Sequence, residues 1–154
     1  MAVPDGNQTL CSCGNRGCLE AVASGSAVAR QLHEHDAGVR TQGDVVALVR
    51  AGDTTAIQAV REAGRDIGSV LAGVVSLLNP SVLVVGGRLS GVGEQLLAGI
   101  RESVYRRSLP LGTHHLRIVS SVCGMRAGIV GASVLVTDTL LSVDGVDALV
   151  RSAG

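Results

Sequence analysis

The chain has 154 residues, and its 13 basic residues, all arginine, balance 13 acidic ones, so that it is formally neutral. A hydrophobic share of 46% against 17% charged residues excludes wholesale disorder and allows one domain with a real core. The neutral balance argues against non-specific binding to nucleic acid or anionic membranes, and the single aromatic residue, Tyr105, leaves almost no surface for base stacking.

Membrane insertion and secretion are not expected. The longest nearly continuous apolar run, from Ile67 to Leu78, is shorter than the roughly 18–20 residues that a membrane-spanning helix needs. The first residues lack the basic and apolar segments of a signal peptide. The sequence therefore predicts a cytoplasmic protein, in which disulfides are rare.

The N-terminal third predicts a loop followed by two helices. Proline, glycine and asparagine dominate the residues before Cys18 and indicate a loop. Apolar residues spaced as on one helix face then predict a single helix from Cys18 through Leu32. A second, short helix is expected with Asp44 as its cap and Gly52 at its end.

The strongest periodic pattern predicts one long helix. Apolar or small residues recur in steps of three and four from Ile57 to Leu78, after a cap at Asp53 or Thr54 and before the Asn79–Pro80 stop. Three glycines interrupt this pattern: Gly64, Gly68 and Gly73. Each weakens the helix by about 1 kcal/mol relative to alanine. We therefore expect another backbone to pack closely against them.

The remaining residues predict an α/β layer around a buried sheet. Val82–Val85 is a short, wholly apolar run that indicates a buried strand, and Leu116–Val119 indicates a second one. A helix is expected between them. The stretch from Arg126 to Leu141 has the composition of a strand but the length of a helix, and a short terminal helix is possible after it.

A cysteine cluster carries the strongest chemical signal. Cys11, Cys13 and Cys18 lie within eight residues of a glycine-rich loop. Thiolates this close can converge on one tetrahedral zinc ion, and glycine lets the backbone wrap around it. The alternatives are a disulfide, which leaves one thiol over, and free or redox-active thiols. Cys123 is distant and is better explained as a small buried hydrophobic residue than as a fourth ligand.

Three motifs resemble the ROK family (repressor, open reading frame, kinase). The run Cys-Ser-Cys-Gly-Asn-Arg-Gly-Cys-Leu-Glu at residues 11–20 matches the family's cysteine signature. Leu-Asn-Pro at 78–80, followed by Val-Val-Gly-Gly at 84–87, resembles a second element, and Ala-Gly-Ile-Val-Gly-Ala at 127–132 resembles a third. The resemblance runs in order from about residue 3 to 140.

The resemblance implies one lobe of an actin-like, ribonuclease H-like sugar kinase fold, a small sheet flanked by helices that include a long one. It implies that Cys11, Cys13 and Cys18 bind structural zinc and that Glu20 contacts sugar hydroxyls. Gly86 and Gly87 would pass close to the adenosine of ATP. From the residues alone, Glu20 is better explained as a carboxylate stabilised at a helix N-terminus, and the glycine pair as a left-handed turn.

The family's first lobe is expected to be missing. No Asp-x-Gly-x-Thr phosphate loop occurs in the sequence, and the family's fourth zinc ligand, a histidine, would precede residue 1. The expected organisation is a cysteine loop at 1–18, the C-terminal lobe at 19–141 and a tail at 142–154. Such a chain alone should not phosphorylate sugar and should self-associate, and water, a histidine or a second chain would complete the zinc site.

The run from Tyr105 to Gly112 resembles ROK regulators. It favours the sugar-sensing, dimerising part of a transcriptional regulator that contacts DNA only through an N-terminal domain outside this chain. The first alternative is the C-terminal lobe of an ATP-dependent sugar kinase. The second is a non-catalytic structural or interaction module from a truncated gene.

Overall fold

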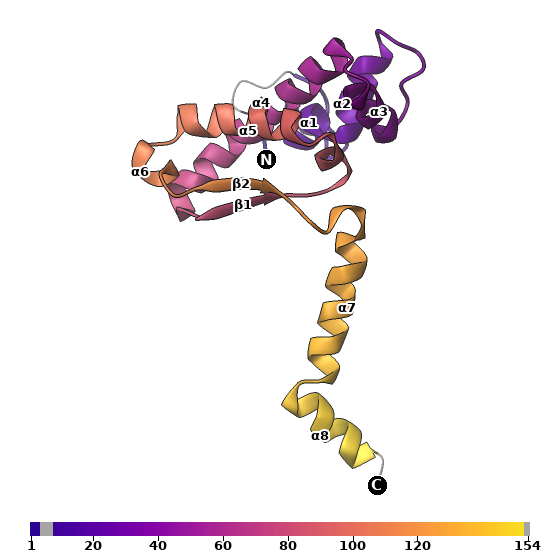
Figure 1. Cartoon of the computed structure of the whole chain (residues 1–154), viewed down its shortest axis with the longest axis vertical. Coiled ribbons are helices and arrows are strands. Elements are labelled where there is room, and N and C mark those ends of the chain that lie inside the picture. Colours follow the sequence, from indigo (N-terminus) through magenta and orange to yellow (C-terminus); the bar gives the residue numbers. More distant parts are fainter. Residues whose placement is uncertain (4–7, 153–154) are drawn as a thin grey trace. The chain divides into compact units, whose positions relative to one another are not determined.

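The computed structural model describes residues 1–3 and 8–152 and divides into two compact units, residues 1–121 and 122–154. Residues 4–7, part of the predicted N-terminal loop, lie outside the described residues. The elements of the first unit (Figure 1) are, in order, α1 (Leu19–Ala23), α2 (Gly25–His33), α3 (Gln42–Arg50), α4 (Thr54–Leu78), β1 (Val82–Val85), the 3-10 helix η1 (Arg88–Val92), α5 (Glu94–Arg107), α6 (Pro110–Thr113) and β2 (Arg117–Ser120).

The long helix α4 is the central element of the first unit, and it confirms the helix predicted from the periodic pattern. Its 25 residues begin after Asp53, whose side chain accepts a hydrogen bond from the Ala56 N–H at 2.7 Å. It ends at Asn79, which adopts the left-handed conformation with φ of 44°. Both ends are therefore set by side chains that the sequence marks as a cap and a stop.

Helices α4 and α5 pack with their backbones almost in contact, and the two lie side by side in Figure 1. A Cβ atom added to Gly64 would lie 2.5 Å from the Leu96 carbonyl oxygen, and one added to Gly68 would lie 2.5 Å from that of Ile100. The predicted close packing is thus confirmed at these two glycines. It is wrong for Gly73, where an added Cβ would meet nothing within 4 Å.

The sheet of the first unit has two parallel strands, with Val82 opposite Arg117 and Val85 opposite Ser120. The strand predicted at Val82–Val85 is confirmed, but the prediction that it is buried is wrong for two of its residues. Leu83 and Val85 pack against the helical core, whereas Val82 and Val84 are exposed. The reason is that, within the described residues, α4 and α5 cover one face of this sheet only.

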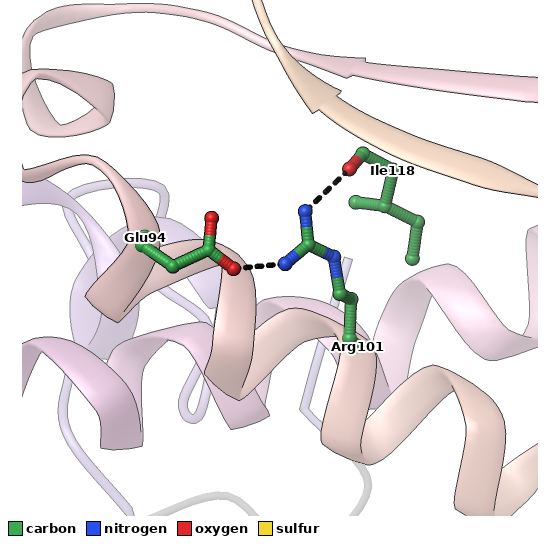
Figure 2. Close-up of polar contacts among 3 residues, drawn as sticks. All are labelled: Glu94, Arg101 and Ile118. Carbon is green, nitrogen blue, oxygen red and sulfur yellow. Dashed lines mark hydrogen bonds and ion pairs between the residues drawn. The ribbon is translucent and has the colours of Figure 1, made fainter.

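Arg101 ties α5 to β2. Its guanidinium donates a hydrogen bond to the Ile118 carbonyl oxygen at 2.9 Å. The same group forms an ion pair with Glu94 at the start of α5 (Figure 2). The planar guanidinium can serve both partners at once, which a lysine ammonium does less well. This contact fixes the strand relative to the helix that packs beneath it.

The single helix predicted from Cys18 to Leu32 is wrong, because the chain forms two helices with a break at Ser24. Ser24 is extended, with φ of −68° and ψ of 158°, and its hydroxyl accepts a hydrogen bond from the Ala27 N–H at 3.1 Å. Serine at such a position caps a new helix rather than continuing an old one. The break places α1 and α2 as separate elements beside α4.

The cap predicted for α3 is also displaced. Thr41, not Asp44, is the N-cap residue, and Asp44 closes a capping box from the third helical position. The Asp44 carboxylate accepts hydrogen bonds from the backbone N–H groups of Arg40 and Thr41, at 2.9 and 2.7 Å. The sequence offered two capping residues three apart, and the reciprocal arrangement uses both.

We predict that Asp44→Asn destabilises the chain at neutral pH but not in acid. The backbone N–H groups of Arg40 and Thr41 hold the pKa of Asp44 below its ordinary value of 3.8. Its contribution to stability is therefore complete above that value and is lost as the pH falls through the folded-state pKa. Urea denaturation should find the wild type more stable than the variant at about pH 6, and this difference in stability should shrink as the pH falls below the ordinary pKa of 3.8. An undiminished difference in acid would contradict this.

The second unit contains the 3-10 helix η2 (Gly124–Arg126), α7 (Ala127–Leu140) and α8 (Val143–Ser152). The ambiguous stretch is thus a helix. Its Ser133 and Thr139 hydroxyls donate to carbonyl oxygens four residues earlier, so these residues are accommodated in helical backbone. Within the described residues no single helix is long and apolar enough to cross a membrane. The pair α7 and α8, bent by 63° at their junction, together has the length and apolar composition of a broken span.

Candidate functional site

The cysteine loop is a small hairpin rather than irregular chain. Leu10 pairs with Arg16 in an antiparallel bridge, and the Cys11 N–H donates to the Asn15 carbonyl oxygen at 2.8 Å. The Gly14 N–H donates to the Cys11 carbonyl oxygen at 2.9 Å and closes a tight turn. The hairpin brings the first two cysteines of the cluster to its tip.

Two glycines allow the hairpin to turn back on the base of α1. Gly14 and Gly17 have φ of 87° and 66°, a region that side-chain-bearing residues rarely adopt. Beyond the hairpin, Ala2 pairs with Cys18, and the Val3 N–H donates to the Gly17 carbonyl oxygen at 2.9 Å. Cys18 is therefore buried and held beside the hairpin tip.

The three thiols converge on one point. The Sγ atoms of Cys11, Cys13 and Cys18 all lie within 4.8 Å of one another, and those of Cys13 and Cys18 are 3.6 Å apart. All three are free thiols rather than half of a disulfide. Among the described residues, these three cysteines are the side chains that lie close enough together to hold a metal ion. Cys123 does not belong to this group.

The electrostatics of the cluster favour one thiolate. A hydrogen bond from the Asn15 backbone N–H, helped by the Cys11 and Cys18 thiols and the Asn15 amide, lowers the pKa of Cys13 to about 7. The hydrogen bond with Cys13, together with burial and the nearby Cys11, raises the pKa of Cys18 to about 11. A divalent cation among the three sulfurs would allow all three to be thiolates, because metal ions displace thiol protons.

Asn15 is the residue of this site that sequence reasoning missed. Besides its backbone donor, its Nδ2 atom lies 3.5 Å from the Cys13 sulfur. Donors of this kind orient a metal ligand and tune its charge. The sequence signal for this role was the order Cys13-Gly14-Asn15, in which a glycine able to turn the chain separates the asparagine from the cysteine.

Glu20 stands in the first turn of α1, two residues after Cys18, which is the N-cap residue of that helix. The Leu19 N–H donates to the Met1 carbonyl oxygen at 2.9 Å, so the start of the helix is tied down. The Glu20 side chain is exposed and makes no hydrogen bond within the described part of the chain. A carboxylate so placed is free to accept hydrogen bonds from hydroxyl groups.

The glycine pair lies at the carboxyl end of β1. Gly87 has φ of 93° and ψ of 178°, a conformation essentially restricted to glycine and outside the left-handed helical region of an ordinary turn. Gly86 needs no such freedom, since an added Cβ would meet Ser121 at an ordinary 3.5 Å. Both are exposed, and no described hydrogen bond joins them to the cysteine loop or to Glu20.

Comparison with known sequences identifies the family of this chain. The ROK family profile matches residues 2–139, most of the chain. The chain belongs to the ROK family. Its α/β architecture and the three motifs around the cysteines, the glycine pair and α7 agree with that membership, and the predicted family and fold class are confirmed.

ROK relatives of two kinds match this chain. A glucokinase from Thermotoga maritima is 32% identical over 90% of this chain and 48% of its own length. A putative xylose repressor from a Caldicellulosiruptor species is 30% identical over 90% of this chain and 38% of its own length. The structure of a ROK glucokinase from Streptomyces griseus in complex with glucose and AMPPNP superposes with a TM-score of 0.72 at 32% identity, over 88% of this chain and 49% of that one. The chain thus spans half or less of these ROK proteins.

Proposed function

We propose that this chain is the sugar-binding C-terminal part of a ROK transcriptional regulator, in which a zinc-bound cysteine loop holds Glu20 against the sugar. The observation that carries the sugar site is the convergence of three thiols directly before the helix that bears this carboxylate. The regulator role is favoured by the run from Tyr105 to Gly112, which resembles ROK regulators. A metal-held loop gives the start of α1 a fixed position. A fixed carboxylate can then select a particular pattern of hydroxyl groups.

Zinc fits the sulfur geometry. In a tetrahedral site with Zn–S distances of about 2.3 Å, neighbouring sulfurs are about 3.8 Å apart. The Cys13 and Cys18 sulfurs are 3.6 Å apart, close to that value. Soft thiolates select zinc over magnesium or calcium. Cys11, Cys13 and Cys18 would hold the ion, whose role would be to fold the loop rather than to react.

Glu20 is the proposed sugar contact. Its exposed carboxylate can accept two hydroxyl hydrogen bonds, and the ion two residues away would hold its backbone in place. The ROK glucokinase from Streptomyces griseus was solved with glucose, which makes glucose the first sugar to test. As a regulator, the protein would respond by linkage, because a sugar that binds one arrangement of the full protein better shifts its affinity for DNA.

We predict that Glu20→Gln weakens glucose binding at least about tenfold, because an amide replaces a charged acceptor. Calorimetric titration of the zinc-loaded chain measures this. Glu34→Gln is the matched control, since Glu34 is also exposed but follows the end of α2. The control should bind glucose like the wild type. Equal binding by the Glu20 variant would remove this residue from the site.

The second candidate is the corresponding lobe of a sugar kinase. The restricted conformation of Gly87 at the end of β1 favours it, because ligands of open α/β sheets bind beyond the carboxyl ends of the strands. Titration with AMPPNP tests this second candidate. Saturable binding that Gly87→Ala abolishes would support the kinase.

A further inference from the structure

A pocket lies on the first unit, between α2 and the segment that leads into α3. Its volume is about 500 Å³, and it is open to solvent. It is lined by three basic side chains, one hydroxyl and two apolar residues: Arg30, His33, Arg40, Ser26, Ala29 and Val39. Among these described lining residues there is no carboxylate, although acidic and basic residues are equal in number over the whole chain.

Two of the basic side chains are held in place by backbone carbonyl groups. Arg30 donates from its Nη2 atom to the Ala21 carbonyl oxygen at 3.0 Å. His33 Nδ1 lies 2.9 Å from the Val39 carbonyl oxygen, and since that oxygen can only accept, Nδ1 carries the proton. His33 Nε2 and the other guanidinium nitrogen of Arg30 remain for a ligand. The groups are therefore oriented before any ligand arrives.

The second guanidinium of the pocket, that of Arg40, makes no hydrogen bond or ion pair to a side chain within the described part of the chain. The Arg40 backbone N–H donates to the Asp44 carboxylate. The neighbouring carboxylates are already in use. Asp36 accepts from the Gly38 N–H at 2.8 Å, and Asp44 completes the capping box of α3. The positive charge of the pocket is thus not neutralised by a direct ion pair.

We propose that this pocket binds a small organic phosphate. Two guanidinium groups offer paired N–H donors that match phosphate oxygens, and a histidine adds a third donor when protonated. The floor is apolar where Ala29 and Val39 line the pocket. That floor suits the organic body of a phosphate monoester rather than free phosphate. The site shares no lining residue with the cysteine cluster, Glu20 or the glycine pair.

The test is an NMR titration of the ¹⁵N-labelled chain with phenyl phosphate, with inorganic phosphate and benzyl alcohol as separate arms at constant ionic strength. We expect saturable shifts in the amide signals of α2 and residues 39–41 with phenyl phosphate. Inorganic phosphate should bind more weakly, and benzyl alcohol should leave these signals unchanged. Equal affinity for the two phosphates would overturn the organic part of the proposal.

Arg40→Gln is the decisive variant, because the backbone N–H that supports the capping box stays in place. It should weaken phenyl phosphate binding about tenfold, and Arg30→Gln should do so as well. Arg106→Gln, at an exposed position of α5, is the control and should bind like the wild type. Shifts that persist unchanged in the Arg40 variant, or no shifts in the wild type, would overturn the site.

Discussion

Gly64→Ala is expected to destabilise the first unit by about 2–3 kcal/mol, the upper range for overpacking a close contact. Its added Cβ would lie 2.5 Å from the Leu96 carbonyl oxygen and 3.1 Å from the Gly99 Cα. These are backbone atoms of α5, so the clash cannot be relieved by rotating a side chain. Gly99→Ala should have a similar effect, because its Cβ would overlap the Arg61 carbonyl oxygen.

Gly73→Ala is the matched control, in the same helix and the same kind of substitution. Its added Cβ meets nothing within 4 Å, so alanine should stabilise the chain by about 0.5–1 kcal/mol through helix propensity alone. Urea denaturation followed by far-ultraviolet circular dichroism measures all three variants. A Gly64 variant as stable as the wild type would show that the two helices do not pack this closely in solution.

Cys18→Ser is expected to lower zinc affinity by about 100-fold or more, because it removes one of three thiolates from a site that has only three ligands in the described chain. Cys11→Ser and Cys13→Ser should behave alike, since the three sulfurs surround one point. Competition against a chromophoric chelator gives the affinity, and elemental analysis gives the metal content of each variant.

Cys123→Ser provides the control for the loss of a thiol. Cys123 belongs to the second unit and lies outside the cysteine cluster. This variant should retain one zinc ion per chain with wild-type affinity. Retention of zinc by the Cys18 variant, or its loss from the Cys123 variant, would assign the ion to other ligands.

The elements that the sequence predicted best are those with strong periodicity and a clear cap. Helix α4 begins after Asp53 and ends at Asn79 as expected, because a 25-residue amphipathic pattern fits few structures other than a helix. Errors arose where two local signals compete. Ser24 could continue a helix or cap a new one, and in the structure its hydroxyl caps α2. The exposure of one face of β1 was not predicted, because a run of apolar residues does not indicate which face of the strand is covered.

The site was predictable where it is local in sequence. Three cysteines within eight residues, separated by glycines, had to lie close together, and the structure places them so. The pocket proposed for an organic phosphate was not predictable, because it unites a helix face bearing Arg30 and His33 with Arg40 from the following segment. No spacing rule connects a helix end to the loop that folds back beside it.

The most direct test of the central claim, that a metal-held cysteine loop positions the sugar-binding carboxylate, is a glucose titration of the same chain with and without zinc. Circular dichroism first establishes that the zinc-free chain keeps its helices. We predict that the zinc-loaded chain binds glucose and that chelation of the ion abolishes binding, with recovery when zinc is restored. Equal glucose affinity of the folded, zinc-free chain would contradict the account.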